Sequence, residues 1–376
     1  MRTIVAVARC QSYSDGVQQA VEKLLHELGG LEQFVQSGQS VLIKPNLLRD
    51  ASPAQAVTTH PEVVRALIRL IKTRGAKPAV ADSPTSVLKI EQVWERTGFR
   101  SMCEEENVPL INLEKAGSKQ FRAGNTSFSV AQPVLDADVL ISVPKVKTHL
   151  LTVFTAAVKN MYGTIPGFQK TILHKLYPKP EQFGEFLAEL YGIVKPKFAI
   201  ADAVVAMEGN GPSGGDPVNL GFLAGSADAV ALDVTLCHLL GIDARKVPYF
   251  QRLHDADMGE TDWEKIEVVG DEQPKLSHLF RVPGIWPGRF IPRWLINALG
   301  SYVWIRPFMN ERCVYCGHCV SACPTGALSI EKGHKPILNR KKCIGCCCCH
   351  EICAERAIEM TQSLLLSLFH GGKLPQ

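Results

Sequence analysis

The sequence predicts an α/β protein built on a mostly parallel, doubly wound sheet and followed by a small α+β unit. Three observations support this prediction. Short apolar runs alternate with stretches of helical periodicity over residues 1–241, as they do in repeated strand–helix units. Ten of the 13 cysteines lie in the last quarter of the chain, and a segment rich in Pro, Trp and Arg precedes them. The predicted divisions are 1–272, 273–305, 306–362 and a tail at 363–376.

The elements of the α/β region follow from hydrophobic periodicity. Strands are expected where short apolar runs end in polar groups, and helices where apolar residues recur at helical spacing up to a glycine. The predicted strands are 1–9, 40–46, 77–82, 137–143, 197–202 and 219–224. The predicted helices are 15–28, 59–75, 152–161 and 226–241. Thr59 and Ser226 are the expected caps of the second and fourth helices. Gly124-Asn125 predicts a hairpin within residues 120–130.

Polar residues follow several of these strands, and in doubly wound sheets ligands bind beyond the carboxyl ends of the strands. Lys145 and Lys147 flank one apolar residue directly after a core strand. Burial and mutual repulsion would lower the pKa of both lysines, and an anionic ligand would be favoured. The predicted catalytic residues are Lys145, Lys147, His149 and Glu208. The predicted ligand-binding residues are Lys44, Asn46, Asp82, Lys159, Asn160 and Asn210.

In this hypothesis the lysines hold a small anion, and His149 or Glu208 moves protons. The alternative interpretation is that these residues are turn residues, helix caps and a solvated basic loop. The glycine-rich segment after Glu208 matches neither the P-loop pattern nor the dinucleotide-binding fingerprint.

The cysteines form two runs with the same spacing, C-x2-C-x2-C-x3-C. This spacing is typical of proteins that bind two [4Fe–4S] clusters, in which the fourth cysteine of each run binds the other cluster. The predicted ligand sets are Cys313, Cys316, Cys319 with Cys353, and Cys343, Cys346, Cys349 with Cys323. A structural zinc site would need only four ligands. A disulfide framework is not expected, because no signal peptide is predicted.

The second run departs from the first in two ways. Cys353 is followed by Ala354, whereas the first run has Pro324 after its fourth cysteine, and the loss of proline would loosen the backbone there. Cys347 and Cys348 are surplus to the spacing. They are interpreted either as small polarizable side chains that fill space beside a cluster, or as alternate ligands or a redox-active thiol.

Residues 306–362 resemble the bacterial two-cluster ferredoxins. The region of about 1–270 resembles the DUF362 family, a domain of unknown function that is often fused to such a ferredoxin. The motifs that carry this resemblance are IKPN (43–46), THPE (59–62), ADSP (81–84), PKVKTH (144–149), KNMYG (159–163) and MEGNGP (207–212). The resemblance implies iron–sulfur clusters at the C-terminal end and no assigned reaction.

The segment 273–310 contains no Asp or Glu. It is interpreted as a linker that docks the cysteine-rich unit onto the α/β domain. The alternative is that residues 281–306 form a cationic, aromatic surface for a membrane or an acidic redox partner. The formal net charge of +4 is too small to predict nucleic-acid binding. No apolar run reaches the roughly 18 residues of a membrane span, and a cytoplasmic location is expected.

The leading hypothesis is an electron-transfer protein or oxidoreductase. Its two [4Fe–4S] clusters would pass electrons between an unidentified redox partner protein and a ligand in the α/β domain. The alternative is a non-catalytic electron carrier or assembly subunit, whose α/β domain binds a protein partner.

Overall fold

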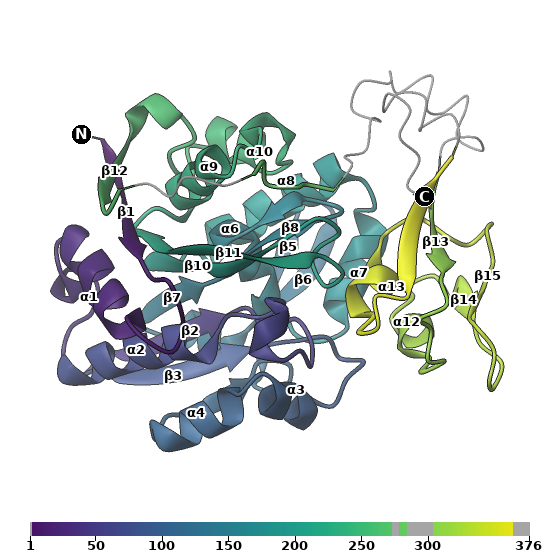
Figure 1. Ribbon diagram of the computed structural model, residues 1–376, viewed down its shortest axis with the longest axis horizontal. Coiled ribbons are helices and arrows are strands. Elements are labelled where there is room, and N and C mark those ends of the chain that lie inside the picture. The colour runs from purple at the N-terminus through teal and green to yellow at the C-terminus, as the bar shows by residue number, and fades with distance from the viewer. Residues whose placement is uncertain (1, 273–277, 284–303, 364–376) are drawn as a thin grey trace.

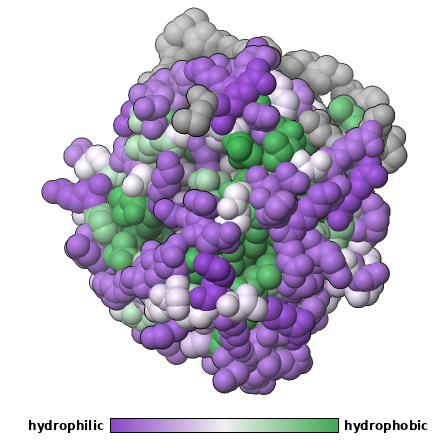
Figure 2. Space-filling model, turned by 90° about the vertical axis from the view of Figure 1, so that its left-hand side faces the viewer, coloured by the Kyte–Doolittle hydropathy of each residue, from purple (hydrophilic) through white to green (hydrophobic). Residues whose placement is uncertain are grey.

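The computed structural model describes residues 2–272, 278–283 and 304–363. A large α/β domain occupies most of the molecule, and a small cysteine-rich unit, residues 304–363, lies at one end of it (Figure 1). The opposite side of the α/β domain carries mainly hydrophilic residues, broken by small hydrophobic patches (Figure 2). The predicted fold class is therefore confirmed.

The α/β domain is built on a ten-stranded sheet within the described residues, with the order β12-β1-β11-β10-β7-β2-β3-β4 and with β8 and β9 attached at β10. All neighbours are parallel except β1–β11, β10–β11 and β8–β9. The strands are β1 Thr3–Arg9, β2 Ser40–Pro45, β3 Lys77–Asp82, β4 Leu110–Asn112, β7 Val139–Val143, β8 Lys145–His149, β9 Val153–Thr155, β10 Phe198–Glu208, β11 Asp216–Ser226 and β12 Ile266–Gly270. A separate hairpin joins β5 Ser118–Ala123 to β6 Thr126–Ala131, as its Gly-Asn turn predicted.

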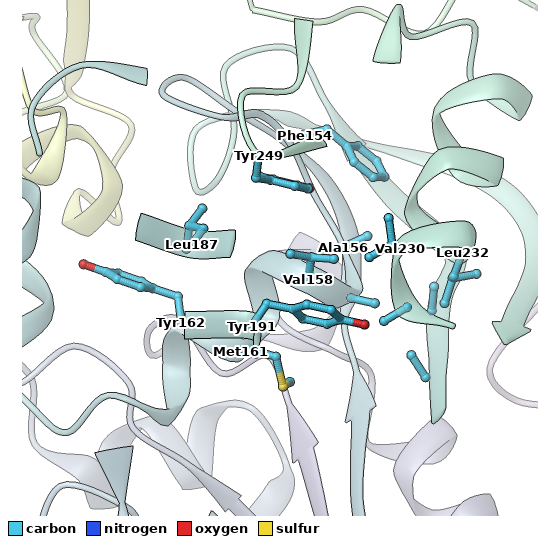
Figure 3. Packing of buried hydrophobic residues seen from close by; sticks show 14 of the residues in the cluster. Phe154, Ala156, Val158, Met161, Tyr162, Leu187, Tyr191, Val230, Leu232 and Tyr249 are labelled. Carbon is cyan, nitrogen blue, oxygen red and sulfur yellow. The ribbon is translucent and has the colours of Figure 1, made fainter. Parts of the chain in front are cut away.

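Helices cover both faces of the sheet, because neighbouring strand residues point to opposite sides. Val5 and Val7 of β1 pack in one apolar cluster, with α8, α9 and α10, whereas Ala6 and Ala8 pack in the other, with α1, α2 and α4. Tyr191, Tyr249 and the aliphatic side chains of α9 fill the first cluster (Figure 3). The helices are α1 Val17–Glu27, α2 Pro61–Thr73, α3 Ile90–Arg96, α4 Phe99–Glu105, α5 Gln132–Asp136, α6 Ala157–Asn160, α7 Gln169–Leu176, α8 Pro180–Ile193, α9 Ala229–Leu239 and α10 Phe250–Asp255.

The predicted helix at 152–161 is wrong. The chain instead forms β9, which pairs with β8, and then the short helix α6. The physical reason lies in the residue types, because Thr152 and Thr155 are β-branched and favour extended backbone. Val153 between them has a positive φ of 67°, which a continuous helix does not allow. The helix begins only after Ala156.

Both predicted helix caps are also wrong. His60 caps α2, and its ring accepts from the backbone N–H of Glu62. Asp228 caps α9. The hydroxyls of Thr59 and Ser226 donate instead to the carbonyls of neighbouring strands, at Val143 (2.7 Å) and Ile4 (2.6 Å). Hydrogen bonds to strand carbonyls thus occupy the two hydroxyl groups that local sequence preference assigned to the helix caps.

The cysteine-rich unit contains two small antiparallel ribbons and two short helices. Its strands are β13 Ile305–Met309, β14 Leu328–Ser329, β15 Ile337–Leu338 and β16 Ile358–Gln362, and its helices are α12 His318–Ser321 and α13 Cys348–Ile352. Strand β13 pairs with β16, and β14 pairs with β15. Val87 and Leu88 of the α/β domain pack against its small apolar core.

The predicted linker at 273–305 and the predicted membrane surface at 281–306 lie largely outside the described residues. In the described part, Phe280 packs into the core of the α/β domain, and Arg281 pairs with Glu208. Among the residues that the structure describes, no helix is long and apolar enough to cross a bilayer.

Candidate functional site

A cavity of about 110 Å³, called the main cavity here, lies between the α/β domain and the cysteine-rich unit. Its α/β wall is formed where β2 and β3 end, by β8 and β9, and by the segment from α6 to α7. The opposite wall comes from α13 and the end of α12. Its charged and polar lining residues are Asn46, Asp82, Ser83, Thr85, Ser86, Lys147, His149, Thr155, Lys159, Asn160, Tyr162, Lys170, Thr171, His174, Cys348 and Glu351.

Six of the ten residues predicted for the site line the main cavity: Asn46, Asp82, Lys147, His149, Lys159 and Asn160. The other four are not among its lining residues. Lys44 pairs with Asp82 (2.7 Å), and Lys145 pairs with Asp202 (2.5 Å). Glu208 pairs with Arg281 (2.8 Å). The carbonyl oxygen of Asn210 lies 3.0 Å from the ring of His350. The catalytic and ligand-binding roles of all ten remain predictions.

Three lysines of the main cavity differ in their partners. Lys147 donates to the carbonyl of Val57 (2.6 Å), and Lys170 donates to the hydroxyl of Ser83 (2.8 Å) and to a carbonyl. Within the described residues, the ammonium of Lys159 makes no hydrogen bond or salt bridge and lies over the ring of Tyr162, 5.7 Å from its centre. Lys159 is therefore the cation of this wall that is open to a ligand.

Burial lowers the pKa of each cavity lysine. The pKa falls to about 8 for Lys159 and to about 7 for Lys170, and it falls well below its usual value for Lys147. The Glu351 carboxylate opposes the shift at Lys159. The positive charge on Lys159 and Lys170 therefore grows as the pH falls through 8 and 7.

The ring of His149 has a defined tautomer. Its Nδ1 atom accepts from the backbone N–H groups of Leu151 (3.1 Å) and Thr152 (3.4 Å), so the proton of the neutral ring is on Nε2. Nε2 lies 3.2 Å from the Glu351 carboxylate, at an angle that leaves both atoms without a hydrogen bond. Burial lowers the pKa of His149 to about 3. This geometry suits a fixed hydrogen-bond donor better than a proton carrier.

Several buried polar atoms of the cavity have no hydrogen-bond partner within the described residues. They include Asn46 Oδ1, Thr155 Oγ1 and His174 Nδ1, besides the facing pair of His149 and Glu351. Buried polar groups in folded proteins are almost always paired. A bound ligand or water would satisfy these atoms, and their concentration in one cavity makes it the candidate binding site.

Asp233 holds α6 in place beneath the cavity. Its buried carboxylate accepts from the backbone N–H groups of Ala157 (2.7 Å) and Val158 (3.1 Å). Burial raises the pKa of Asp233 to about 7. Because α6 carries Lys159 and Asn160, this contact positions two of the lining residues.

Sequence reasoning missed several lining residues, among them Tyr162, Lys170, His174 and Glu351. Lys170 and His174 are four residues apart on α7, so they share one helix face. That spacing was the sequence signal that could have identified them as site residues. No sequence signal identified Glu351, because it belongs to the cysteine-rich unit and reaches the cavity only after the two units dock.

Backbone contacts hold α13 against the α/β domain. The hydroxyl of Ser213 donates to the carbonyl of Glu351 (2.6 Å). The ring nitrogens of His350 face the carbonyls of Asn210 (3.0 Å) and Ile358 (2.7 Å). The loop between β10 and β11 therefore fixes α13 along one side of the main cavity.

Two further cavities lie in the cysteine-rich unit, and each contains one of the predicted ligand sets. The first thiol cavity is lined by Cys313, Cys316, Cys319 and Cys353, together with Asp50 and Arg96 of the α/β domain. The second thiol cavity is lined by Cys323, Cys343, Cys346 and Cys349, and also by Cys347. Within the described residues, no three His, Cys, Asp or Glu side chains converge as on one metal ion. Four thiols around a space fit the larger body of an iron–sulfur cluster.

The two surplus cysteines lie on different sides of this arrangement. Cys347 has a positive φ of 63° just before α13 and lines the second thiol cavity. Cys348 lines the main cavity, where Lys159 and Tyr162 are near it. Cys348, which lines the main cavity, is therefore the direct chain neighbour of the predicted cluster ligand Cys349.

Two family models match the chain. The model described as Domain of unknown function (DUF362) matches residues 41–238. The model described as 4Fe-4S binding domain matches residues 307–329. The Thylakoid-associated protein sll1697 of Synechocystis sp. is 35% identical over 249 residues, which cover 65% of this chain and 76% of that protein. Both parts of the predicted resemblance are thus confirmed, and an iron–sulfur cofactor is supported.

Two shorter or weaker similarities complete the comparison. The Pyruvate synthase subunit PorD of Methanothermobacter marburgensis is 35% identical over 65 residues, which cover 17% of this chain and 75% of that protein. The lactate racemase apoprotein from Thermoanaerobacterium thermosaccharolyticum aligns with a TM-score of 0.42 and 13% identity, over 64% of this chain and 57% of that one. An alignment at this level supports no inference about the site.

Proposed function

This chain belongs to the DUF362 family and carries a 4Fe-4S ferredoxin-type segment, and from that premise we propose that it exchanges electrons with a small anion bound in the main cavity. The electrons would pass through two [4Fe–4S] clusters held by the two cysteine sets. A redox partner protein would supply or remove them at the cysteine-rich unit. The similarity to PorD supports the electron-transfer part of this proposal.

The observation that carries the proposal is the position of α13. Cys348 and Glu351 of this helix line the main cavity, whereas Cys349 of the same helix lines the second thiol cavity. When bound, the clusters supply one-electron transfer. The chain itself has to hold the ligand close to them, and α13 lines both cavities with residues that are neighbours in the chain.

The cavity residues divide the remaining tasks. Lys159 is open to an anionic group, and Lys170 adds positive charge below its pKa of about 7. His149 presents its Nε2–H to an acceptor oxygen of the ligand or to Glu351. The wall formed by α13 separates the ligand from bulk solvent on that side, which strengthens each of these interactions.

The direct test is the reoxidation of the reduced protein. Protein prepared without oxygen and reduced with dithionite, which is then removed, would be mixed with a panel of small carboxylates and phosphates while the visible absorbance of the clusters is followed. We expect at least one compound to reoxidise the wild type rapidly. The informative members of the panel are anions with a reducible group, such as 2-oxo and unsaturated carboxylates, and the phosphates are controls that can bind but cannot accept electrons. Lys159→Gln should slow the reaction with the active compound at least tenfold, and Lys195→Gln, at an exposed lysine, should leave it unchanged. Equal rates in wild type and Lys159→Gln would refute the assignment of the cavity.

The number of clusters is tested by iron and sulfide analysis with EPR spectroscopy of the reduced protein. Two [4Fe–4S] clusters require about eight irons per chain and a signal split by two interacting centres. About four irons would limit the proposal to one cluster and would remove one of the two thiol cavities from the electron path.

A second candidate function is a non-catalytic electron carrier or assembly subunit. The similarity to a protein that is named as a subunit of pyruvate synthase favours it. This function predicts a stoichiometric protein partner in purification from the native source and no small molecule that reoxidises the clusters. The unpartnered polar atoms of the main cavity favour the first proposal.

A further inference from the structure

Arg49 is a buried cation without a partner. It lies between β2 and the 3-10 turn Pro53–Gln55, only 1% of it is exposed, and it is among the largest fully buried side chains of the molecule. Within the described residues its guanidinium makes no hydrogen bond or salt bridge, and its Nε atom is buried and unpaired. Burying an unpaired charge is costly, so buried charges are normally matched by an opposite one.

The nearest side-chain carboxylate is already engaged. Asp50 follows Arg49 in the chain, but its carboxylate lies 3.6 Å from the guanidinium of Arg96. Asp50 and Arg96 both line the first thiol cavity. Arg356, three residues after Cys353, is a further cation near Arg49, and it pairs with Asp216. Of the three arginines on this side of the thiol cavity, Arg96 and Arg356 therefore have carboxylate partners, whereas Arg49 has none within the described residues.

A cysteine of the first thiol cavity is close enough to act electrostatically on Arg49. Among the groups that act electrostatically on Arg49, the thiol of Cys353 is the second anionic one after Asp50. Cys353 lines the first thiol cavity with Cys313, Cys316 and Cys319. Four thiolates around an iron–sulfur core give a complex with a net negative charge, and reduction makes that charge larger.

We propose that Arg49 is the buried counter-ion of the cluster held by Cys313, Cys316, Cys319 and Cys353, and that it raises the reduction potential of this cluster. The proposal rests on the presence of a cluster in this cavity, as in the proposed function, but not on any ligand of the main cavity. A cation stabilises the more negative, reduced state more than the oxidised state. Because burial excludes water and salt, Arg49 acts more strongly than an exposed arginine at a similar distance.

The arrangement also gives a role to the contact between the two units. Arg49 belongs to the α/β domain, whereas all four cysteines belong to the cysteine-rich unit. The potential of this cluster therefore depends on docking, and a detached cysteine-rich unit would lose the counter-ion. Arg49 would thus adjust the reduction potential of this cluster only when the two units are docked.

The experiment is a redox titration of the full-length, cluster-loaded protein, followed by EPR spectroscopy. Arg49→Met removes the charge and retains an apolar side chain of similar length, whereas Arg49→Lys retains the charge. Arg74→Met, at an exposed arginine at the end of α2, is the matched control. We expect Arg49→Met to lower the reduction equilibrium constant of one cluster about tenfold, because the reduced, more negative cluster loses the attraction of a buried cation. That change corresponds to about 59 mV for a one-electron couple.

Arg49→Lys should recover most of the shift, and Arg74→Met should show none. Three results would overturn the proposal. The first is an unchanged potential in Arg49→Met. The second is an equal shift in Arg49→Met and Arg49→Lys, which would indicate a structural effect of the guanidinium rather than its charge. The third is a protein with about four irons, all bound by the other cysteine set. A protein that binds two clusters but has no turnover with small anions would defeat the proposed function and leave this inference standing.

Discussion

Two groups of buried charges lie along the same edge of the sheet, and they differ in how completely they are paired. Around Asp202, the carboxylate accepts from Tyr13 (2.7 Å) and pairs with Lys145 (2.5 Å), and the backbone N–H of His60 donates to it (2.9 Å). In the main cavity, Lys159 has no such partner and several polar atoms are unpaired. A closed network supports the fold, whereas an open one is available to a ligand.

The comparison teaches that residue type and position do not by themselves distinguish a structural charge from a binding charge. Lys145 and Lys147 are two residues apart on β8, and both are fully buried. Their partners differ: the ammonium of Lys145 is paired with a carboxylate, whereas Lys147 donates to a backbone carbonyl and lines the main cavity. The predictions below test this distinction.

The largest expected effect is on stability, from Lys145→Met. Removing one partner of a buried ion pair leaves the other charge uncompensated, so we expect a loss of about 3–5 kcal/mol in the free energy of unfolding. Denaturant titration measures it, with Lys195→Met as the control. A variant with wild-type stability that no longer binds anions would reverse the roles that the comparison assigns.

Asp233→Asn should have the next largest effect. An amide offers only one acceptor oxygen, so one of the N–H groups of Ala157 and Val158 would lose its partner, at a cost of about 1–3 kcal/mol. Anion affinity should fall as well, because α6 carries Lys159. Asp228→Asn is the matched control, since Asp228 likewise accepts backbone N–H groups with both oxygens but does not hold α6. If both variants lose equal stability and neither loses affinity, Asp233 does not position the cavity.

Lys159→Gln is expected to affect binding rather than stability. The affinity for oxalate, measured by calorimetry, should fall at least tenfold, while the free energy of unfolding stays within about 1 kcal/mol of the wild type, because the lost ammonium had no partner. A large loss of stability with unchanged affinity would show that Lys159, like Lys145, is a structural charge and not a binding charge.

The pH dependence of oxalate binding tests whether Lys159 and Lys170 bind the anion. The pKa of Lys159 is lowered to about 8 and that of Lys170 to about 7, and each lysine is charged only below its pKa. Affinity should therefore be greatest below pH 7 and fall as the pH rises through 7 and 8, although oxalate stays fully ionised throughout. In Lys159→Gln the step near pH 8 should disappear. A flat profile would exclude both lysines from the binding site.

The smallest effect is expected at the exposed contact between the two units. Asp216 pairs with Arg281 (2.8 Å) and Arg356 (3.4 Å), and its side chain is 56% exposed. Asp216→Asn should change the free energy of unfolding by less than about 1 kcal/mol, because solvent screens such pairs. A larger loss, measured by the same denaturant titration, would show that the units depend on surface charges and not on the buried wall of the cavity.

Much of the fold was predictable because apolar periodicity and turn residues act locally. Strand β3 has the predicted bounds, and the hairpin of β5 and β6 forms at its predicted turn. The predictions failed where distant partners decided the outcome. Thr59 and Ser226 bond to other strands instead of capping helices, and β9 forms because β8 is beside it to pair with.

The candidate site shows the same limit. The rule that ligands bind at strand ends found Asn46, Asp82, Lys147 and His149, because the parallel order of the strands brings their carboxyl ends to one edge. It did not separate these residues from Lys44 and Lys145, whose carboxylate partners, Asp82 and Asp202, are 38 and 57 residues away in the chain. Nor could it find Glu351, which a separate unit contributes.

The sequence by itself determined the α/β class, the two cysteine sets and the strand ends at which charged residues gather, because each depends on spacing along the chain. Only the tertiary structure decided which of those charges are paired. It also decided that α13 closes the main cavity with Cys348 and Glu351, and that Arg49 is buried beside the first thiol cavity. Pairing and burial depend on which segments, distant in the sequence, come into contact in the fold. The spacing of residues along the chain does not determine those contacts directly.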